Sequence, residues 1–279
     1  MNASEVQPQA EVLPPLPPGF NFPFYYASLQ SFWLYYLVDP ARIGKHLDGT
    51  GMRPALFDGA ALVNINFQRY TAHLAPLLST VNEIEFNIVA YPASRQRDVP
   101  QIAVNDYLAG QEQTKLVGNF RLHVAADNPH AVQAGVDAFG EPKFLTSFSY
   151  SVPDLNDQGD GSWTVQCNDP VDPTRFIFRF VANAAALGPR SVDMSPIRGY
   201  TMCRGRLLGN AWNLYNHYLS ATAVASDLVQ LDFGDSAHAL RLDMQALIGD
   251  TPVYAMQSLA PLVAATQGRG YWVDPQTPD

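Results

Sequence analysis

Two stretches in the first third of the chain alternate strictly between apolar and polar side chains. Between residues 61 and 70, valine, isoleucine and phenylalanine are separated by asparagine or glutamine. From Asn82 onward, Glu83 and Glu85 alternate with isoleucine and phenylalanine in the same way. A period of two places successive side chains on opposite faces of a β-strand. We therefore predict two strands, each with one hydrocarbon face and one face of amides or carboxylates.

Capping and turn signals divide the rest of the chain into short helices and further strands. The pair Asn128-Pro129 predicts the start of a helix, and Gly140 followed by Pro142 predicts its end. Another helix start is predicted at Asp39-Pro40. Further strands are predicted over residues 31–38, 144–152, 175–182, 204–208 and 223–233 and from residue 163, a hairpin loop over 156–161, and helices over 212–219 and 237–247.

The N-terminus differs in composition from the rest of the chain. Residues 1–23 include six prolines and few large apolar side chains before Phe20. This composition favours an extended, polyproline-like arm. No linker or internal repeat is visible after residue 24, so residues 24–279 are predicted to form a single α+β, β-rich domain with a few short helices.

The charge balance disfavours several kinds of partner. The chain has 17 Lys+Arg against 26 Asp+Glu, a formal net charge of −9, which argues against nucleic acid and anionic membranes. Residues 1–6 lack the features of a secretory signal, and no apolar run reaches the about 18 residues of a membrane span, so we expect a cytoplasmic protein. Cys167 and Cys203 are expected to be free thiols. The histidines have no close metal-ligand spacing, and we expect neither a metal nor a cofactor.

Lysine is scarce, and one lysine has an unusual setting. The chain contains Lys45, Lys115 and Lys143. Lys143 follows a Gly-Glu-Pro turn and precedes the apolar start of a predicted strand. A lysine amine attacks a carbonyl only when neutral, which at an ordinary pKa of about 10.4 applies to about one molecule in several thousand at pH 7. From these residues alone, Lys143 is either a surface lysine or a nucleophile whose pKa burial lowers.

The residues around Lys143 resemble the acetoacetate decarboxylase-like family, whose reactive lysine follows a Gly-x-Pro turn after a similar helix. The similar residues are Asp127-Asn128-Pro129, Ala131, Gly135 and Gly140-x-Pro142-Lys143, with Tyr36–Asp39, Asn82-Glu83 and residues 231–253 matching other parts of the family in order. The resemblance spans most of residues 25–260. It implies a closed, cone-shaped antiparallel β-barrel, a homo-oligomer, and covalent catalysis through an imine between a buried lysine and a keto acid.

Three departures from the family pattern bear on the reaction. The family's second lysine is replaced by Phe144, so that desolvation alone has to lower the pKa of Lys143. The family's arginine ahead of the first strand falls near Leu29 or Gln30, and one of its glutamates falls on Asn66. The glutamate at position 83 is kept. Members of the superfamily that keep the lysine also perform aldol condensation and dehydration, so both reaction types stay open.

We therefore predict a Schiff-base-forming lyase, of aldolase-dehydratase or decarboxylase type, that acts on a small-molecule keto acid or ketone. Lys143 is the predicted nucleophile and Glu83 the predicted proton carrier. The predicted substrate-binding residues are Asn66, Gln68, Glu85 and Phe144, although Glu85 also fits a solvated strand face. The alternative is a non-catalytic small-molecule-binding barrel of the same fold, which the three departures favour.

Overall fold

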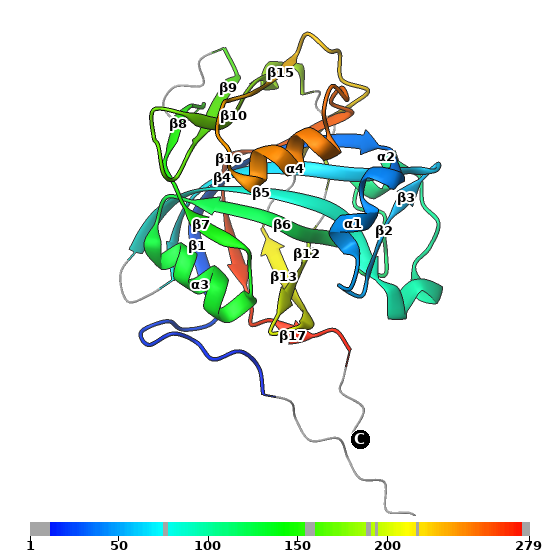
Figure 1. Ribbon diagram of the computed structural model, residues 1–279, viewed down its shortest axis with the longest axis vertical. Coiled ribbons are helices and arrows are strands. Elements are labelled where there is room, and N and C mark those ends of the chain that lie inside the picture. Colours follow the sequence, from blue (N-terminus) through cyan, green and yellow to red (C-terminus); the bar gives the residue numbers. More distant parts are fainter. Residues whose placement is uncertain are drawn as a thin grey trace, which may run out of the picture.

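A closed, mixed barrel of seven strands forms the body of the protein (Figure 1). The computed structural model describes residues 12–74, 78–153, 160–187, 191–192, 195–215 and 218–274. In order around the barrel, the strands are β16 (Ala255–Gln267), β1 (Phe24–Val38), β4 (Ala60–His73), β5 (Leu78–Pro92), β6 (Gly118–Ala126), β12 (Ile197–Cys203) and β13 (Arg206–Leu214), and β13 pairs with β16 to close the ring.

The predicted closed, β-rich fold is confirmed, but the barrel is not antiparallel throughout. β12 pairs with β6 in parallel, through Gly199 opposite Asn119 and Tyr200 opposite Phe120. A parallel pair cannot be joined by a hairpin and needs a longer excursion of the chain. Here the excursion includes α3 (Pro129–Phe139) and most of a second, smaller sheet.

The second sheet has the order β15-β10-β9-β8 and lies beside the barrel. Its strands are β8 (Phe148–Ser151), β9 (Ser162–Asn168), β10 (Phe176–Asn183) and β15 (Val229–Phe233). The remaining elements are β2 (Met52–Pro54), β3 (Leu56–Phe57), β7 (Lys143–Leu145), β11 (Ser191–Val192), β14 (Tyr218–Thr222), β17 (Tyr271–Trp272), α1 (Gly44–Leu47), α2 (Val104–Leu108), α4 (Ala239–Leu247) and the 3-10 helices η1 (Pro40–Arg42), η2 (Ala93–Asp98) and η3 (Ala184–Ala186). None of the helices in the described ranges has the length and apolar character that crossing a bilayer requires.

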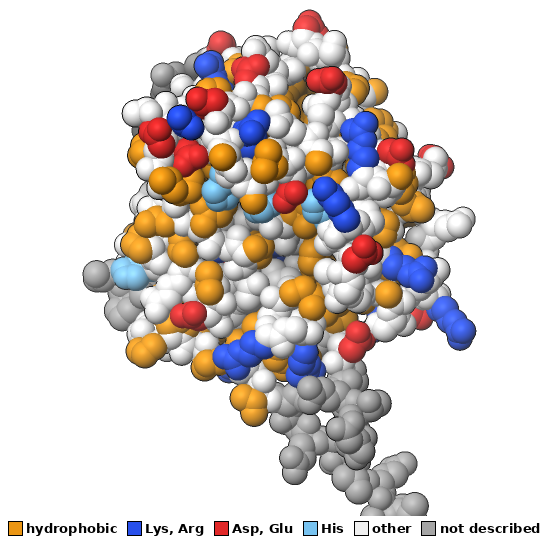
Figure 2. Space-filling view, viewed as in Figure 1, with side chains coloured by type: hydrophobic (Ala, Val, Ile, Leu, Met, Phe, Trp, Pro, Cys, Tyr) orange, Lys and Arg blue, Asp and Glu red, His pale blue; other side chains and the backbone are white. Residues whose placement is uncertain are grey.

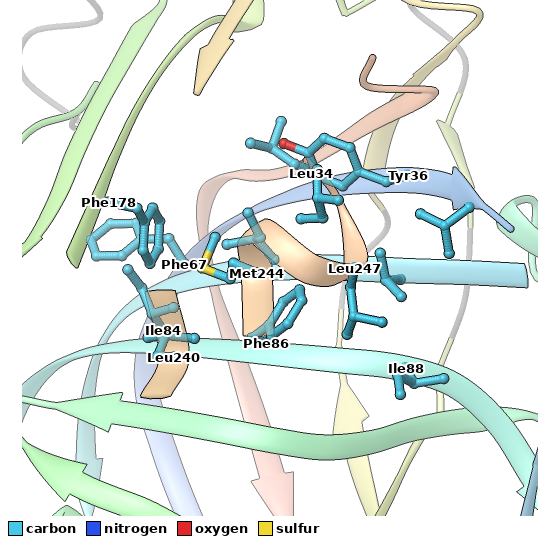
Figure 3. Close-up of a cluster of buried hydrophobic side chains, with 14 of the residues drawn as sticks. Leu34, Tyr36, Phe67, Ile84, Phe86, Ile88, Phe178, Leu240, Met244 and Leu247 are labelled. Carbon is cyan, nitrogen blue, oxygen red and sulfur yellow. The ribbon is translucent and has the colours of Figure 1, made fainter. Parts of the chain in front are cut away.

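The alternating pattern of β4 and β5 produces two different interiors. The hydrocarbon face of both strands points out of the barrel and is covered by α4 and the smaller sheet, so that Phe67, Phe86, Phe178, Met244 and Leu247 share one core (Figure 3). The amide and carboxylate face points into the barrel. The two strands pair so that each amide side chain of β4 lies opposite a polar side chain of β5: Asn64 with Asn87, Asn66 with Glu85, and Gln68 with Glu83.

Several predicted boundaries are corrected by the structure. The helix predicted over residues 212–219 is wrong: Trp212 and Leu214 are alternate, buried positions of β13, and residue 218 begins β14. The strand predicted over 144–152 is two strands, β7 and β8, in different sheets, and of the strand predicted over 223–233 only β15 forms. The strand predicted over 204–208 starts at Arg206, because Arg204 and Gly205 form a left-handed turn.

Two predicted segments lie partly or largely outside the described residues. The hairpin loop predicted over residues 156–161 is described only at positions 160–161. Of the predicted arm, residues 12–23 contain neither helix nor strand, and Phe20 packs into the barrel core beside Phe24. The carbonyl oxygens of Val12 and Pro14 accept hydrogen bonds from Trp272 and Arg269.

We expect Phe67→Ala to lower the free energy of unfolding by about 3–5 kcal/mol, because a fully buried ring between the barrel and its outer cover leaves a cavity when truncated. Val171→Ala, at a side chain that is 90% exposed, is the control and should change it by less than about 0.5 kcal/mol. Urea titration of both variants measures the difference. Equal effects would contradict the two-core arrangement.

Candidate active site

Lys143 reaches the interior of the barrel from the turn that follows α3. The Asn128 side chain caps α3 by accepting hydrogen bonds from the backbone N–H groups of His130 and Ala131. Gly140 ends the helix with φ 64°, a left-handed conformation that glycine adopts without strain. Because successive residues of β7 point to opposite sides, Lys143 points into the barrel while the residue after it points out.

A glycine of α3 makes room for this lysine. A Cβ atom added at Gly135 would lie 2.5 Å from Lys143 Cδ and 3.3 Å from its Nζ, and it would also collide with Glu141 Oε2. Glycine at this position therefore lets the lysine stem pass directly against the helix. Gly135 belongs to the set of residues on which the family resemblance rests.

The Lys143 ammonium is held by two buried carboxylates. Its Nζ lies 2.7 Å from Glu83 Oε2 and 3.3 Å from Glu141 Oε2. The side chains of all three residues are 6% exposed or less. The hydroxyl of Tyr70 donates a hydrogen bond of 2.8 Å to the same Glu83 oxygen. Glu83 is thus fixed between a phenol and an amine.

Arg121, on β6, is the second buried cation of the site. Its Nε lies 3.1 Å from Glu85 Oε1 and 3.3 Å from Glu141 Oε1, so Glu141 bridges Arg121 and Lys143. Its Nη1 lies against Gly199, where any Cβ atom would collide with it. Arg121 therefore holds Glu85 and Glu141 in position and is itself held by the barrel wall.

The cluster contains one more acid than base. Glu83, Glu85 and Glu141 face Lys143 and Arg121, and all five side chains are buried. Acidic and basic side chains are interspersed on the surface seen in Figure 2, where water weakens their interactions. Inside the barrel the same charges interact far more strongly, because the surroundings are less polarisable than water. If all five were ionised, the cluster would carry one net negative charge.

The environment of Lys143 raises its pKa instead of lowering it. Burial opposes the charged amine, but the carboxylates of Glu141 and Glu83 outweigh it and raise the pKa of Lys143 to about 12. The expectation that desolvation alone keeps this amine neutral is therefore wrong. Burial raises the pKa of Glu83, with further repulsion from Glu141 and Glu85 acting against the attraction of Lys143. The environment of Glu83 therefore favours its protonated form.

The cluster lines a small cavity of about 30 Å³, which is room for about two water molecules. Polar groups of Tyr26, Gln68, Tyr70, Trp212 and Gln267 complete one part of its wall. The remaining lining is apolar and comes from Phe24, Leu74, Ala131, Ala134, Gly135 and Phe139. Within the described residues, no group of three or more His, Cys, Asp or Glu side chains is placed to hold a metal ion.

The structure brings together four of the six predicted site residues. Lys143, Glu83, Glu85 and Gln68 all line the cavity. Asn66 does not: it lies two residues before Gln68 on the same face of β4, fully buried and outside the cavity lining.

Phe144 does not line the cavity either. Its ring packs against His238, with the ring centroids 4.3 Å apart, and against the outer core. Phe144, which we expected to contact substrate, thus lies outside the cavity lining, because neighbouring residues of β7 point to opposite faces.

Arg121 and Glu141 are the residues that sequence reasoning missed. Arg121 follows Asn119 at a spacing of two among apolar residues, the same signal that identified the polar faces of β4 and β5. Glu141 sits inside the Gly-x-Pro turn, where its backbone N–H donates to the carbonyl of Gly135. No local pattern in the turn indicates that its side chain turns inward.

Solved structures resemble this chain, although no family model and no curated protein matches its sequence. The enduracididine biosynthesis enzyme MppR, complexed with the condensation product of pyruvate and imidazole 4-carboxaldehyde, is 14% identical with a TM-score of 0.61, over 91% of this chain and 90% of that chain. Acetoacetate decarboxylase from Legionella pneumophila is 11% identical with a TM-score of 0.59, over 98% of each chain. An acetoacetate decarboxylase-like enzyme from Sphingomonas wittichii RW1 is 13% identical with a TM-score of 0.60, over 95% of this chain and 100% of that chain. The predicted acetoacetate decarboxylase-like fold is confirmed.

We expect Gly135→Ala to reduce the free energy of unfolding by about 1–3 kcal/mol, because the new methyl group overpacks the space that Lys143 and Glu141 occupy. Gly44→Ala is the matched control, since a Cβ atom there meets nothing within 4 Å. Chemical denaturation of the two variants tests this difference. If both variants unfold like the unsubstituted protein, α3 does not constrain the lysine.

Proposed function

We propose that this protein, which has the acetoacetate decarboxylase-like fold, is a lyase that forms a Schiff base between Lys143 and a keto acid or ketone. The observation that carries the proposal is an amine enclosed in a cavity with a carboxylate of raised pKa at 2.7 Å. A buried lysine, whose charged form is costly to remove from water, is a common feature of reactive sites.

Proton transfer within the pair activates the amine. When the ammonium of Lys143 gives a proton to Glu83 Oε2, the products are a neutral amine and a neutral acid. This transfer removes one negative and one positive charge from the cluster, and burial, which raises the pKa of Glu83, lowers the cost of forming the two neutral groups. Tyr70 keeps the receiving oxygen oriented toward the amine. The amine becomes nucleophilic without an adjacent second lysine.

The amine then adds to the carbonyl carbon of the substrate. The carbonyl oxygen takes a proton from the attacking nitrogen to give a carbinolamine, and the proton that Glu83 received is returned to the departing hydroxyl, so that water leaves and an iminium forms. The positive nitrogen accepts the electron pair of a breaking C–C or C–H bond beside the former carbonyl carbon. Glu83, ionised again, is placed to receive an α-proton.

The carboxylates that raise the pKa of Lys143 also stabilise this iminium. An iminium carries the same single positive charge as the ammonium it replaces, at the same position between Glu83 and Glu141. Carboxylates fixed before the reaction stabilise charge that develops there without further reorganisation. The ion pairs thus favour the cationic intermediate once the amine has reacted.

A binding barrel without turnover is the second candidate. The observation that favours it is the pKa of Lys143, which its acidic neighbours raise to about 12. A permanent ammonium would bind a polar ligand by hydrogen bonds and form no covalent bond.

Trapping with borohydride separates the two candidates. We expect incubation with acetoacetate, pyruvate or simple ketones, followed by borohydride, to add the reduced substrate to Lys143 and to leave Lys45 and Lys115 unlabelled, because an imine is reduced to a stable amine only where it forms. Peptide mass spectrometry locates the adduct. Lys143→Arg should abolish trapping, whereas Lys115→Arg should leave it unchanged. Labelling at Lys45 or Lys115 alone, or no labelling with any carbonyl compound, would contradict the proposal.

The role of Glu83 predicts a change in the pH profile. In the unsubstituted protein, trapping should slow as pH falls through the raised pKa of Glu83, since the protonated acid cannot accept the proton. Glu83→Gln should trap about 10²–10⁴-fold more slowly at neutral pH, and its rate should keep increasing into the alkaline range as solvent removes the lysine proton. Asp137→Asn, on the exposed face of α3, is the charge-matched control. A Glu83→Gln variant with the original rate and profile would exclude Glu83 as the proton carrier.

A further inference from the structure

The cationic side chains that line the cavity already form ion pairs with carboxylates. Among the described residues that line it, Lys143 and Arg121 carry positive charge, and each lies within 3.3 Å of two carboxylate groups. Glu141 is shared between them. Three acids against two bases leave no positive charge in excess to balance a further anion.

A keto acid would bring a fourth carboxylate into this space. Like charges at short distance in a buried site repel strongly, and an unbalanced buried charge is costly. Arg121 is poorly placed to relieve this repulsion: its Nε faces Glu85 and Glu141, and its Nη1, which has no hydrogen-bond partner among the described residues, is buried beside the backbone of Gly199. Binding a carboxylate there would require Arg121 to leave Glu85, which would then be buried without its partner.

The uncharged part of the lining suits a small hydrocarbon group. Phe24, Leu74, Ala131, Ala134 and Phe139 form an apolar wall beside the cluster. Tyr26 and Tyr70 already use their hydroxyls as donors, to Gln267 and Glu83. An alkyl group buried against this wall loses no hydrogen bond, and the small cavity of about 30 Å³ favours a short one.

We propose that the Lys143 site selects small uncharged ketones or aldehydes and discriminates against keto acids. This inference rests on the proposed Schiff-base function. It also narrows the reaction: a substrate without a carboxylate has no carbon dioxide to lose. The iminium would instead give its α-proton to Glu83 and form an enamine, whose carbon bonds to the carbonyl carbon of an aldehyde while the aldehyde oxygen takes the proton back from Glu83. Hydrolysis of the resulting iminium consumes one water and returns the amine.

A matched pair of probes tests the selectivity. Acetoacetate and its methyl ester share the same ketone, but only the acid is charged. Borohydride trapping at Lys143 is measured for both, and each rate is divided by that of imine formation with a simple free amine to remove intrinsic reactivity. We expect the ester to be trapped at least about tenfold faster than the acid.

Removing one negative charge from the cavity should reduce this discrimination. Glu85→Gln keeps the shape of the side chain, and we expect it to shift the ester-to-acid ratio toward the acid by about tenfold, whereas Asp137→Asn, which removes a charge outside the cavity, should leave the ratio unchanged. The selectivity itself is measured on the unsubstituted protein, so that this part of the test does not depend on whether a variant folds.

The outcomes are distinguishable. Equal or faster trapping of the acid at Lys143 overturns the selectivity and leaves the Schiff-base function standing. An ester preference that Glu85→Gln does not alter overturns the electrostatic cause. No adduct at Lys143 with either probe, or with any simple ketone, overturns the proposed function and this inference together.

Discussion

A cluster of five charged side chains in the middle of a barrel is the constraint on which the rest of the structure depends. Carboxylates and cations can be buried only if they satisfy one another, and Glu141 does so for both Lys143 and Arg121. Their strands must turn polar faces inward. The hydrocarbon faces of the same strands then point outward and need a cover, which α4 and the smaller sheet supply.

The cluster also determines where side chains must be absent. Gly135 on α3 leaves room for the stem of Lys143, and Gly199 on β12 leaves room for the guanidinium of Arg121. One of these glycines lies in a helix and the other in a strand. Neither has a positive φ, so they are required by close approach and not by backbone conformation. At both positions the charged side chains of the cluster pack directly against the backbone.

Local patterns in the sequence predicted the secondary structure around the site well. The period of two identified β4 and β5, and the cap at Asn128 with the stop at Gly140 identified α3. The same patterns could not indicate which side of a strand faces the barrel interior, because that depends on how distant strands close. They therefore did not indicate that Phe144 would point away from the cavity.

The raised pKa of Lys143 could not be predicted from neighbouring residues for the same reason. The scarcity of lysine in the chain and the turn before Lys143 identified this residue as a candidate nucleophile. The residues that raise its pKa come from β5 and from the turn itself, and Glu83 is 60 positions away in the sequence. The residues next to Lys143 in the sequence are apolar and predicted a lowered pKa. In the folded barrel, the carboxylates around Lys143 raise its pKa instead.

The parallel seam between β6 and β12 has a consequence for how the chain folds. Residues 127–196 intervene between the two strands, so the ring cannot close until that excursion has been made. Contacts between segments so far apart in sequence carry a large loop-closure entropy and form slowly. Until β12 pairs with β6, Gly199 does not cover the guanidinium of Arg121. Complete dehydration of Arg121 therefore requires this pairing, whereas its carboxylate partners Glu85 and Glu141 lie on segments that precede β12 in the chain.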